Sequence, residues 1–170
     1  MTILKDIDAQ TVYEIFMPVR SIVRDRTYED IVEDINNGIL TLKVIDIRIL
    51  DLELPPKHGN ESDYHRLLKA NAGKLLSEMG EDKVTYEKKD FSSDVFGESL
   101  KIRVECDSTN GKRLYDTLCM TKEFWVLQYP YEKGISQLYK FKINHRRLIE
   151  VCPEVKDRVT EETLSQFLAE

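Results

Sequence analysis

Residues 94–107 read DVFGESLKIRVECD, and the second half of this stretch alternates strictly between apolar and charged side chains. Alternation with a period of two is typical of a β-strand, because successive side chains point to opposite faces of a sheet. We therefore predict a strand over residues 99–108 with one apolar face and one charged face. The apolar side chains are Leu100, Ile102, Val104 and Cys106, and the charged ones are Lys101, Arg103, Glu105 and Asp107.

The charged face of this strand carries residues suited to catalysis. Glu105 and Asp107 are two positions apart and point to the same side, and Asp94 begins a short strand predicted over residues 94–96. If the two strands pair, three carboxylates converge, and a divalent cation relieves their repulsion. Oxygen ligands favour Mg²⁺ or Mn²⁺, which can activate water and stabilise charge on a phosphodiester. The alternative interpretation is an ordinary solvated face.

The surrounding pattern predicts an α/β fold of the α+β kind, a mixed central β-sheet flanked by helices. Ser62 or Asp63 begins a helix whose apolar side consists of Leu67, Leu68, Leu75, Leu76 and Met79. Three strands follow, and a helical crossover then leads to further strands, so the sheet contains parallel and antiparallel pairs. The predicted ranges, besides 94–96 and 99–108, are strands over 83–91, 124–129 and 137–143 and helices over 112–120, 145–151 and from Thr160 onward.

Residues 1–54 are predicted to form an N-terminal helix-plus-strand extension. An apolar stripe predicts a helix over 8–17, and a second helix follows Thr27 and ends at Asn36-Asn37-Gly38. Alternating β-branched residues then predict a strand over 39–54. The Pro- and Gly-containing segment 55–61 is the predicted linker to a domain of residues 62–170.

Over residues 62–130 the order of these elements resembles the PD-(D/E)XK, or restriction-endonuclease-like, nuclease superfamily. A helix precedes Tyr86-Glu87, an isolated Asp94 follows, and an apolar strand ends at Glu105 before a helix that carries Lys112 and Arg113. The resemblance implies a restriction-endonuclease-like fold and hydrolysis of phosphodiester bonds with Mg²⁺. Asp94 matches the motif aspartate and Glu105 the motif glutamate.

Two residues depart from the pattern of that superfamily. Ser93 precedes Asp94 in place of the motif proline, and Asp107 occupies the position of the motif lysine, which helps to activate the attacking water. In this chain Asp107 would serve as a further metal ligand beside Asp94 and Glu105, and Lys112 would supply the amine. The resemblance therefore implies four catalytic residues, Asp94, Glu105, Asp107 and Lys112, although loss of activity is the other outcome consistent with Asp107.

Basic residues suggest where a nucleic-acid backbone could be held. The expected phosphate contacts are Lys112, Arg113, Arg146 and Arg147, because arginine can grip phosphate through two hydrogen bonds. The last two belong to a basic cluster that also includes Lys140, Lys142 and His145, at the end of a strand and the start of a helix. The alternative is a solvated face whose cations pair with nearby acids.

Charge and hydropathy argue against a uniformly basic nucleic-acid-binding protein, a membrane-spanning protein and a secreted protein. The net charge of −6 argues against uniform coating of nucleic acid, although a local basic groove is compatible with it. No run of about 18 apolar residues exists and residues 1–10 lack a secretory pattern, so we expect a cytoplasmic protein. The cysteines, Cys106, Cys119 and Cys152, show no zinc-binding spacing and are expected to be buried thiols.

Two functions remain open at this point. The first is a metal-dependent nuclease that acts on DNA in preference to RNA, in which residues 1–54 add either a surface for homodimer formation or an element that contacts DNA. The second is a catalytically inactive module on the same fold, whose acidic surface binds a protein partner.

Overall fold

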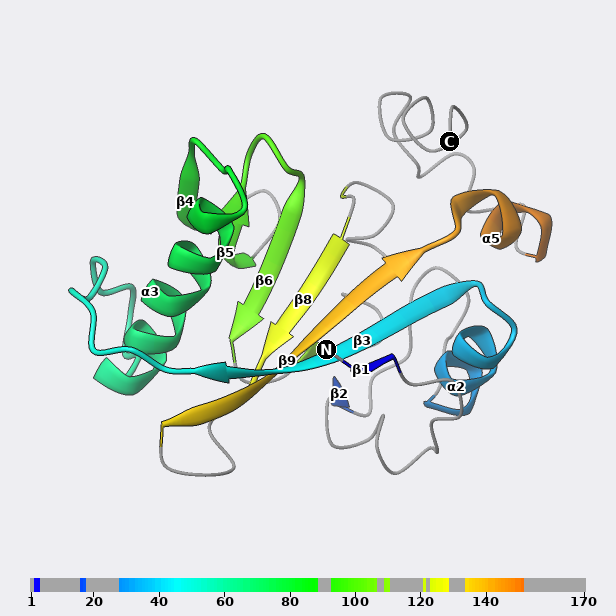
Figure 1. Ribbon diagram of the computed structural model, residues 1–170, viewed down its shortest axis with the longest axis horizontal. Coiled ribbons are helices and arrows are strands. Elements are labelled where there is room, and N and C mark those ends of the chain that lie inside the picture. Colours follow the sequence, from blue (N-terminus) through cyan, green and yellow to red (C-terminus); the bar gives the residue numbers. More distant parts are fainter. Residues whose placement is uncertain are drawn as a thin grey trace.

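The structure is a computed structural model, and it describes residues 2–3, 16–17, 28–88, 93–106, 109–110, 121, 123–128 and 134–151 of the 170. The helices in these ranges are α2 (Tyr28–Asn36), α3 (Asp63–Glu78) and α5 (His145–Val151). The strands are β1 (Thr2–Ile3), β2 (Phe16–Met17), β3 (Leu40–Arg48), β4 (Val84–Lys88), β5 (Ser93–Gly97), β6 (Ile102–Cys106), β7 (Thr109–Asn110), β8 (Glu123–Leu127) and β9 (Ile135–Ile143) (Figure 1).

A mixed sheet of seven strands forms the centre of the fold, in the order β1-β3-β9-β8-β6-β5-β4 (Figure 1). Strands β6 and β8 are parallel, whereas the other neighbouring strands of this sheet are antiparallel. The outermost strand β1 has only two residues, and a small second sheet pairs β2 with β7. The predicted mixed α/β architecture is therefore confirmed. The helices predicted over 112–120 and from Thr160 lie outside the described residues.

Strand β3 places the N-terminal part of the chain in the same sheet as the C-terminal part. It pairs with β9 over its whole length, from Leu40 opposite Ile143 to Arg48 opposite Ile135. The strand predicted over 39–54 is too long, because the chain leaves the sheet after Arg48 and bonds to α3 instead. There the Asn71 side chain accepts a hydrogen bond from Leu50 N at 2.8 Å and donates one to Leu50 O at 3.0 Å. The division of the chain at residues 55–61 stays a prediction.

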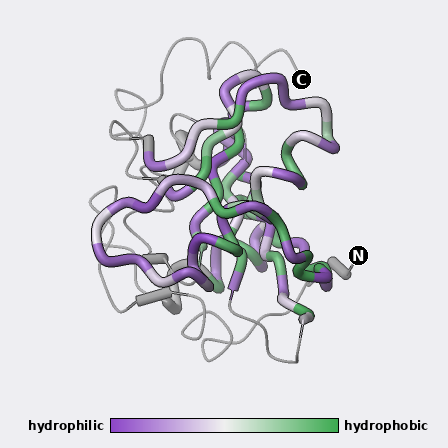
Figure 2. Tube along the Cα trace, turned by 90° about the vertical axis from the view of Figure 1, so that its left-hand side faces the viewer, coloured by the Kyte–Doolittle hydropathy of each residue, from purple (hydrophilic) through white to green (hydrophobic). Residues whose placement is uncertain are grey.

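The core lies between helix α3 and the sheet. Leu68, Ala72 and Leu76 of α3 pack with Val95 and Val104 of the adjacent strands, and all five side chains are buried. Hydrophobic residues are concentrated where the strands cross the middle of the molecule, and hydrophilic residues predominate in a loop that projects from one side (Figure 2). The apolar side predicted for α3 is thus largely confirmed.

Two of the predicted helical features are wrong. Phe16 and Met17, placed in a helix by their apolar stripe, form strand β2 because their backbones pair with residues of β7. The rest of the 8–17 range lies outside the described residues. Met79 is 46% exposed rather than part of the apolar side of α3, because the helix ends at Glu78 and the chain turns at Gly80, whose φ is +99°.

Gly73 allows α3 to approach strand β4 closely, and this contact gives the first prediction. A Cβ at position 73 would overlap the Tyr86 hydroxyl and lie 3.2 Å from Tyr86 Cζ. Overpacking of this kind costs about 1–3 kcal/mol, against a gain in helix propensity of at most about 1 kcal/mol. Gly73→Ala should therefore lower the midpoint of urea unfolding. Adding Tyr86→Phe should recover part of the loss, and an increase in stability for Gly73→Ala alone would contradict the contact.

Candidate functional site

Strands β5 and β6 bring Asp94 and Glu105 together. Their antiparallel register sets Val95 opposite Val104, so Asp94 and Glu105 are the next residues to face each other across the pair. Asp94 Oδ2 accepts the Cys106 N–H at 2.7 Å. The expected proximity of Asp94 and Glu105 is thus present, while Asp107, Lys112 and Arg113 lie outside the described residues.

Helix α3 adds a buried lysine that the sequence analysis missed. Lys69 has a fully buried side chain, and its Nζ lies 3.0 Å from Glu61 Oε2 and 2.8 Å from Glu87 Oε1. Glu61, His65 and Lys69 follow one another at intervals of four residues, which places them on one side of the helix and the turn that precedes it. That spacing was the one signal in the sequence that could have linked Lys69 to an acidic site.

The backbone of strand β4 turns Glu87 towards Lys69. Glu87 has φ of +52°, a left-handed conformation that is costly for a residue with a side chain. Its carboxylate is 30% exposed and bonds to Lys69. Strain of this kind persists only where surrounding contacts compensate for it, and the bond to a buried ammonium is one such contact.

His65 joins the helix to the carboxylate of Asp94. Its Nε2 lies 3.4 Å from Asp94 Oδ1 and 3.8 Å from Glu61 Oε2. The hydrogen bond to Asp94 raises the pKa of His65 above its usual value, although burial acts in the opposite direction. Burial alone would raise the pKa of Asp94, but the hydrogen bonds from His65 and from the Cys106 N–H outweigh it and lower that pKa. Asp94 is therefore held as a carboxylate.

Arg103 and Glu105 form an ion pair inside the protein. The Nε and Nη2 atoms of Arg103 lie 3.1 Å and 2.7 Å from Glu105 Oε1, and each side chain is only 3% exposed. The guanidinium also stacks over the Phe124 ring, with its central carbon 5.7 Å from the ring centroid. The alternative of a solvated face is thus wrong for Arg103 and Glu105. Both charged side chains of strand β6 are therefore buried, as its apolar side chains are.

Counted over the described residues alone, the charges of this cluster leave an excess of negative charge. Four carboxylates lie beside two permanent cations, Lys69 and Arg103; the carboxylates are those of Glu61, Glu87, Asp94 and Glu105. Two negative charges remain when His65 is neutral, and one divalent cation would balance them. The donor set therefore fits a cation of the kind that carboxylate oxygens select, Mg²⁺ or Mn²⁺.

Within the cluster, two positions compete for such a cation. Ligand atoms of Glu61, His65 and Glu87 all lie within 4.8 Å of one another. Two of these residues already bond to the ammonium of Lys69, which would repel a second cation. Asp94 instead accepts hydrogen bonds from an imidazole and a backbone N–H, which offset less of its charge. Glu105, however, already bonds to the Arg103 guanidinium, so each of the two positions has a permanent cation beside it.

The second group of predicted residues lies at the other end of the sheet. Strand β9 is antiparallel to β8, and β8 is parallel to β6, so residues that follow β9 are remote from the end of β6 that carries Glu105. Arg146 and Arg147 follow β9 in helix α5, whose N-terminal end Asn144 caps by accepting the Arg147 N–H at 3.1 Å. The structure therefore does not bring these arginines to Asp94 and Glu105.

Comparison with protein-family models, with curated proteins and with solved structures finds no match to this chain. Among the residues that the structure describes, no helix combines the length and the apolar character needed to cross a membrane. The assignment of a function therefore rests on the chemistry of the residues themselves.

Proposed function

We propose that this chain is a metal-dependent nuclease related in fold to the PD-(D/E)XK superfamily, with its active site at Asp94 and Glu105. The observation that carries the proposal is the pairing of these two acids across antiparallel strands, beside the N-terminal end of a helix. The order α3, β4, β5, β6 and the parallel strand β8 is also the order that the resemblance implies. DNA is the preferred substrate in this proposal.

Each residue of the cluster has a role in this mechanism. Asp94 and Glu105 would hold Mg²⁺ or Mn²⁺, which lowers the pKa of a bound water and stabilises negative charge on a phosphodiester. His65 orients Asp94, and Arg103 orients Glu105, through the hydrogen bonds described above. Lys69 pairs with Glu61 and Glu87 and would supply the ammonium group that Asp107 cannot provide at the motif position.

The proposal predicts cleavage of labelled DNA with Mg²⁺ or Mn²⁺ and none with EDTA. Asp94→Asn and Glu105→Gln should each lower the cleavage rate at least about 100-fold, because partners outside the ligand shell already cost 10–100-fold. Asp82→Asn and Glu53→Gln, which change exposed acids elsewhere, are matched controls and should keep wild-type rates. Cleavage that persists in both active-site variants would refute the assignment.

An inactive module on the same fold is the second candidate, and one observation favours it. Lys69 and Arg103 already pair with three of the four acids, which is an arrangement that can stabilise the fold without any substrate. Thermal unfolding with and without Mn²⁺ shows whether the protein binds metal at all, and the cleavage assay shows whether it is active. A melting temperature that Mn²⁺ raises in the wild type but not in Asp94→Asn, without cleavage of DNA or RNA, would indicate metal binding without catalysis.

A further inference from the structure

A group of cations lies on one face of strands β3 and β9, at their end near helix α5. We call Lys43, Lys140, Lys142 and Arg146 the basic face. Lys43 is the register partner of Lys140, and Lys142, two residues further along β9, points to the same side as Lys140. Arg146 follows in the first turn of α5, and Lys142 and Arg146 are both exposed.

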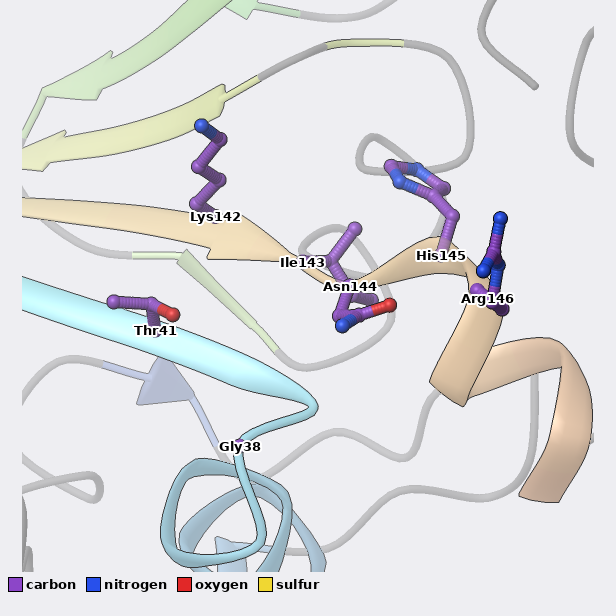
Figure 3. Close-up of a pocket in the computed structure, with 7 residues that line it drawn as sticks. All are labelled: Gly38, Thr41, Lys142, Ile143, Asn144, His145 and Arg146. Carbon is purple, nitrogen blue, oxygen red and sulfur yellow. The ribbon is translucent and has the colours of Figure 1, made fainter. Parts of the chain in front are cut away.

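The basic face includes a pocket of about 370 Å³ between Lys142 and Arg146 (Figure 3). Thr41, Asn144 and His145 contribute polar side chains to its wall, and Gly38 closes one side. Arg147 supports that side, because its Nη1 donates to the Asn37 carbonyl at 2.9 Å. None of the described residues that line the pocket carries a carboxylate, although the chain contains 31 acidic residues. The pocket is therefore suited to an anion.

The cations beyond the pocket are arranged in a way that costs folding free energy. Like charges directly opposite each other on neighbouring strands are destabilising, and Lys43 faces Lys140 in this manner. The Lys140 ammonium lies 4.3 Å from the centroid of the Trp125 ring, so its position is fixed by packing. Burial lowers the pKa of Lys140, and the charge of Lys43 lowers it further, against the influence of Glu123. A bound anion would relieve the repulsion between these lysines.

The extent of the basic face indicates a ligand with several negative charges. Lys140 and Lys142 lie two positions apart on strand β9, which is a distance of about 7 Å. Lys43 lies beside Lys140 on the next strand. One phosphate in the pocket would contact Lys142 and Arg146 but would leave the repulsion between Lys43 and Lys140 in place. A chain of phosphates can reach all four cations, although Lys142 also faces the carboxylate of Glu123 on strand β8.

The surroundings of the basic face favour nucleic acid over an acidic protein. Protein interfaces are usually centred on exposed aromatic or apolar anchors. In the described part of the chain the exposed large hydrophobic residues are Tyr64 and Met79, in and just after helix α3, away from the basic face. Hydroxyl, amide, ammonium and guanidinium groups are instead the groups that contact phosphate oxygens.

We propose that the basic face binds the phosphate backbone of a nucleic acid, with one phosphate in the pocket between Lys142 and Arg146 and its neighbours against Lys140 and Lys43. This inference rests on the proposed function for its choice of ligand, and it adds a second contact region. Lys140 lies in the register row of Trp125 and Val104, so its side chain and that of Glu105, the residue after Val104, point to opposite faces of the sheet. Lys142 lies further from Glu105 along the strands, so the basic face would contact the substrate at a distance from the bond that is cut.

Fluorescence anisotropy with labelled single-stranded and duplex oligonucleotides, in EDTA, tests this proposal without any cleavage. The double variants Lys142→Gln/Arg146→Gln and Lys43→Gln/Lys140→Gln should each weaken binding at least 10-fold. Each should also lower the slope of log K against log salt by about 1.4–1.8, which corresponds to two phosphate contacts. Lys57→Gln/Lys83→Gln removes two exposed lysines elsewhere and should change affinity less than about 2-fold. Lys43→Gln alone should melt no lower than the wild type.

Three outcomes would overturn the proposal. Both double variants could bind as the wild type does, or polyglutamate could displace the oligonucleotide as well as unlabelled DNA does. The third is loss of binding in Lys142→Gln/Arg146→Gln alone, with full displacement by millimolar inorganic phosphate, which would reduce the site to a single-phosphate pocket. If the wild type binds the oligonucleotide but does not cleave it, the proposed nuclease activity is refuted, whereas the proposal that the basic face binds nucleic acid still holds.

Discussion

Replacing Lys69 by methionine is expected to destabilise the protein by about 3–5 kcal/mol, the range for removing one partner of a buried ion pair. The Lys69 side chain is fully buried and bonds to Glu61 and Glu87, of which Glu61 is only 8% exposed. Without the ammonium, both carboxylates would face each other with no cation between them. Urea unfolding at neutral pH measures the loss directly.

Lys74→Met is the matched control for this prediction. Lys74 belongs to the same helix, but it is 43% exposed and its contact with Glu78 is 3.8 Å long, so its loss should cost less than about 1 kcal/mol. The Lys69 variant should also gain a response to metal, because Glu61, His65 and Glu87 then become available together. Mn²⁺ should raise its melting temperature more than that of the wild type. Equal losses in the two lysine variants would contradict the buried ion pair.

The second large effect is expected at the buried pair of Arg103 and Glu105. Arg103→Met should cost about 3–5 kcal/mol, because Glu105 would keep its charge in a site where its side chain is 3% exposed. The double variant Arg103→Met/Glu105→Met should recover most of this loss, since both charges are then replaced by apolar groups.

Arg48→Met, at an exposed arginine of strand β3, serves as the control and should stay within about 0.5 kcal/mol of the wild type. With Glu105→Met added, denaturant unfolding of the wild type, the two single variants and the double variant completes a double-mutant cycle. If Arg103→Met and the double variant prove equally unstable, the two side chains do not act as a pair.

Local signals in the sequence predicted much of the fold. The alternation in residues 102–106 predicted β6, Ser62 predicted the start of α3, and Gly38, with φ of +76°, follows the end of α2. These signals depend on neighbouring residues, so a sequence reveals them. The partner of β3 could not be predicted in the same way, because nothing in residues 40–48 specifies β9 over another strand.

In the candidate site, too, the residues that local sequence signals could identify differ from those that depend on distant contacts. Asp94 and Glu105 could be predicted as neighbours because a short hairpin joins their strands, and register follows from a short connection. Lys69 could not, because it lies between Leu68 and Ala70 and its partner Glu87 depends on an unusual backbone conformation. The burial of Glu105 was also hidden, since alternation separates two faces without showing that both are covered.

The pairing of β3 with β9 also has a consequence for how the chain folds. Residues of β3 and β9 are far apart in the sequence, so this ladder raises the contact order and is expected to form after the local hairpin of β5 and β6. Until then, β9 is an edge strand whose unpaired backbone groups can bind another chain. A fragment that begins after residue 61 would keep that edge permanently open, and aggregation is the outcome to expect from it.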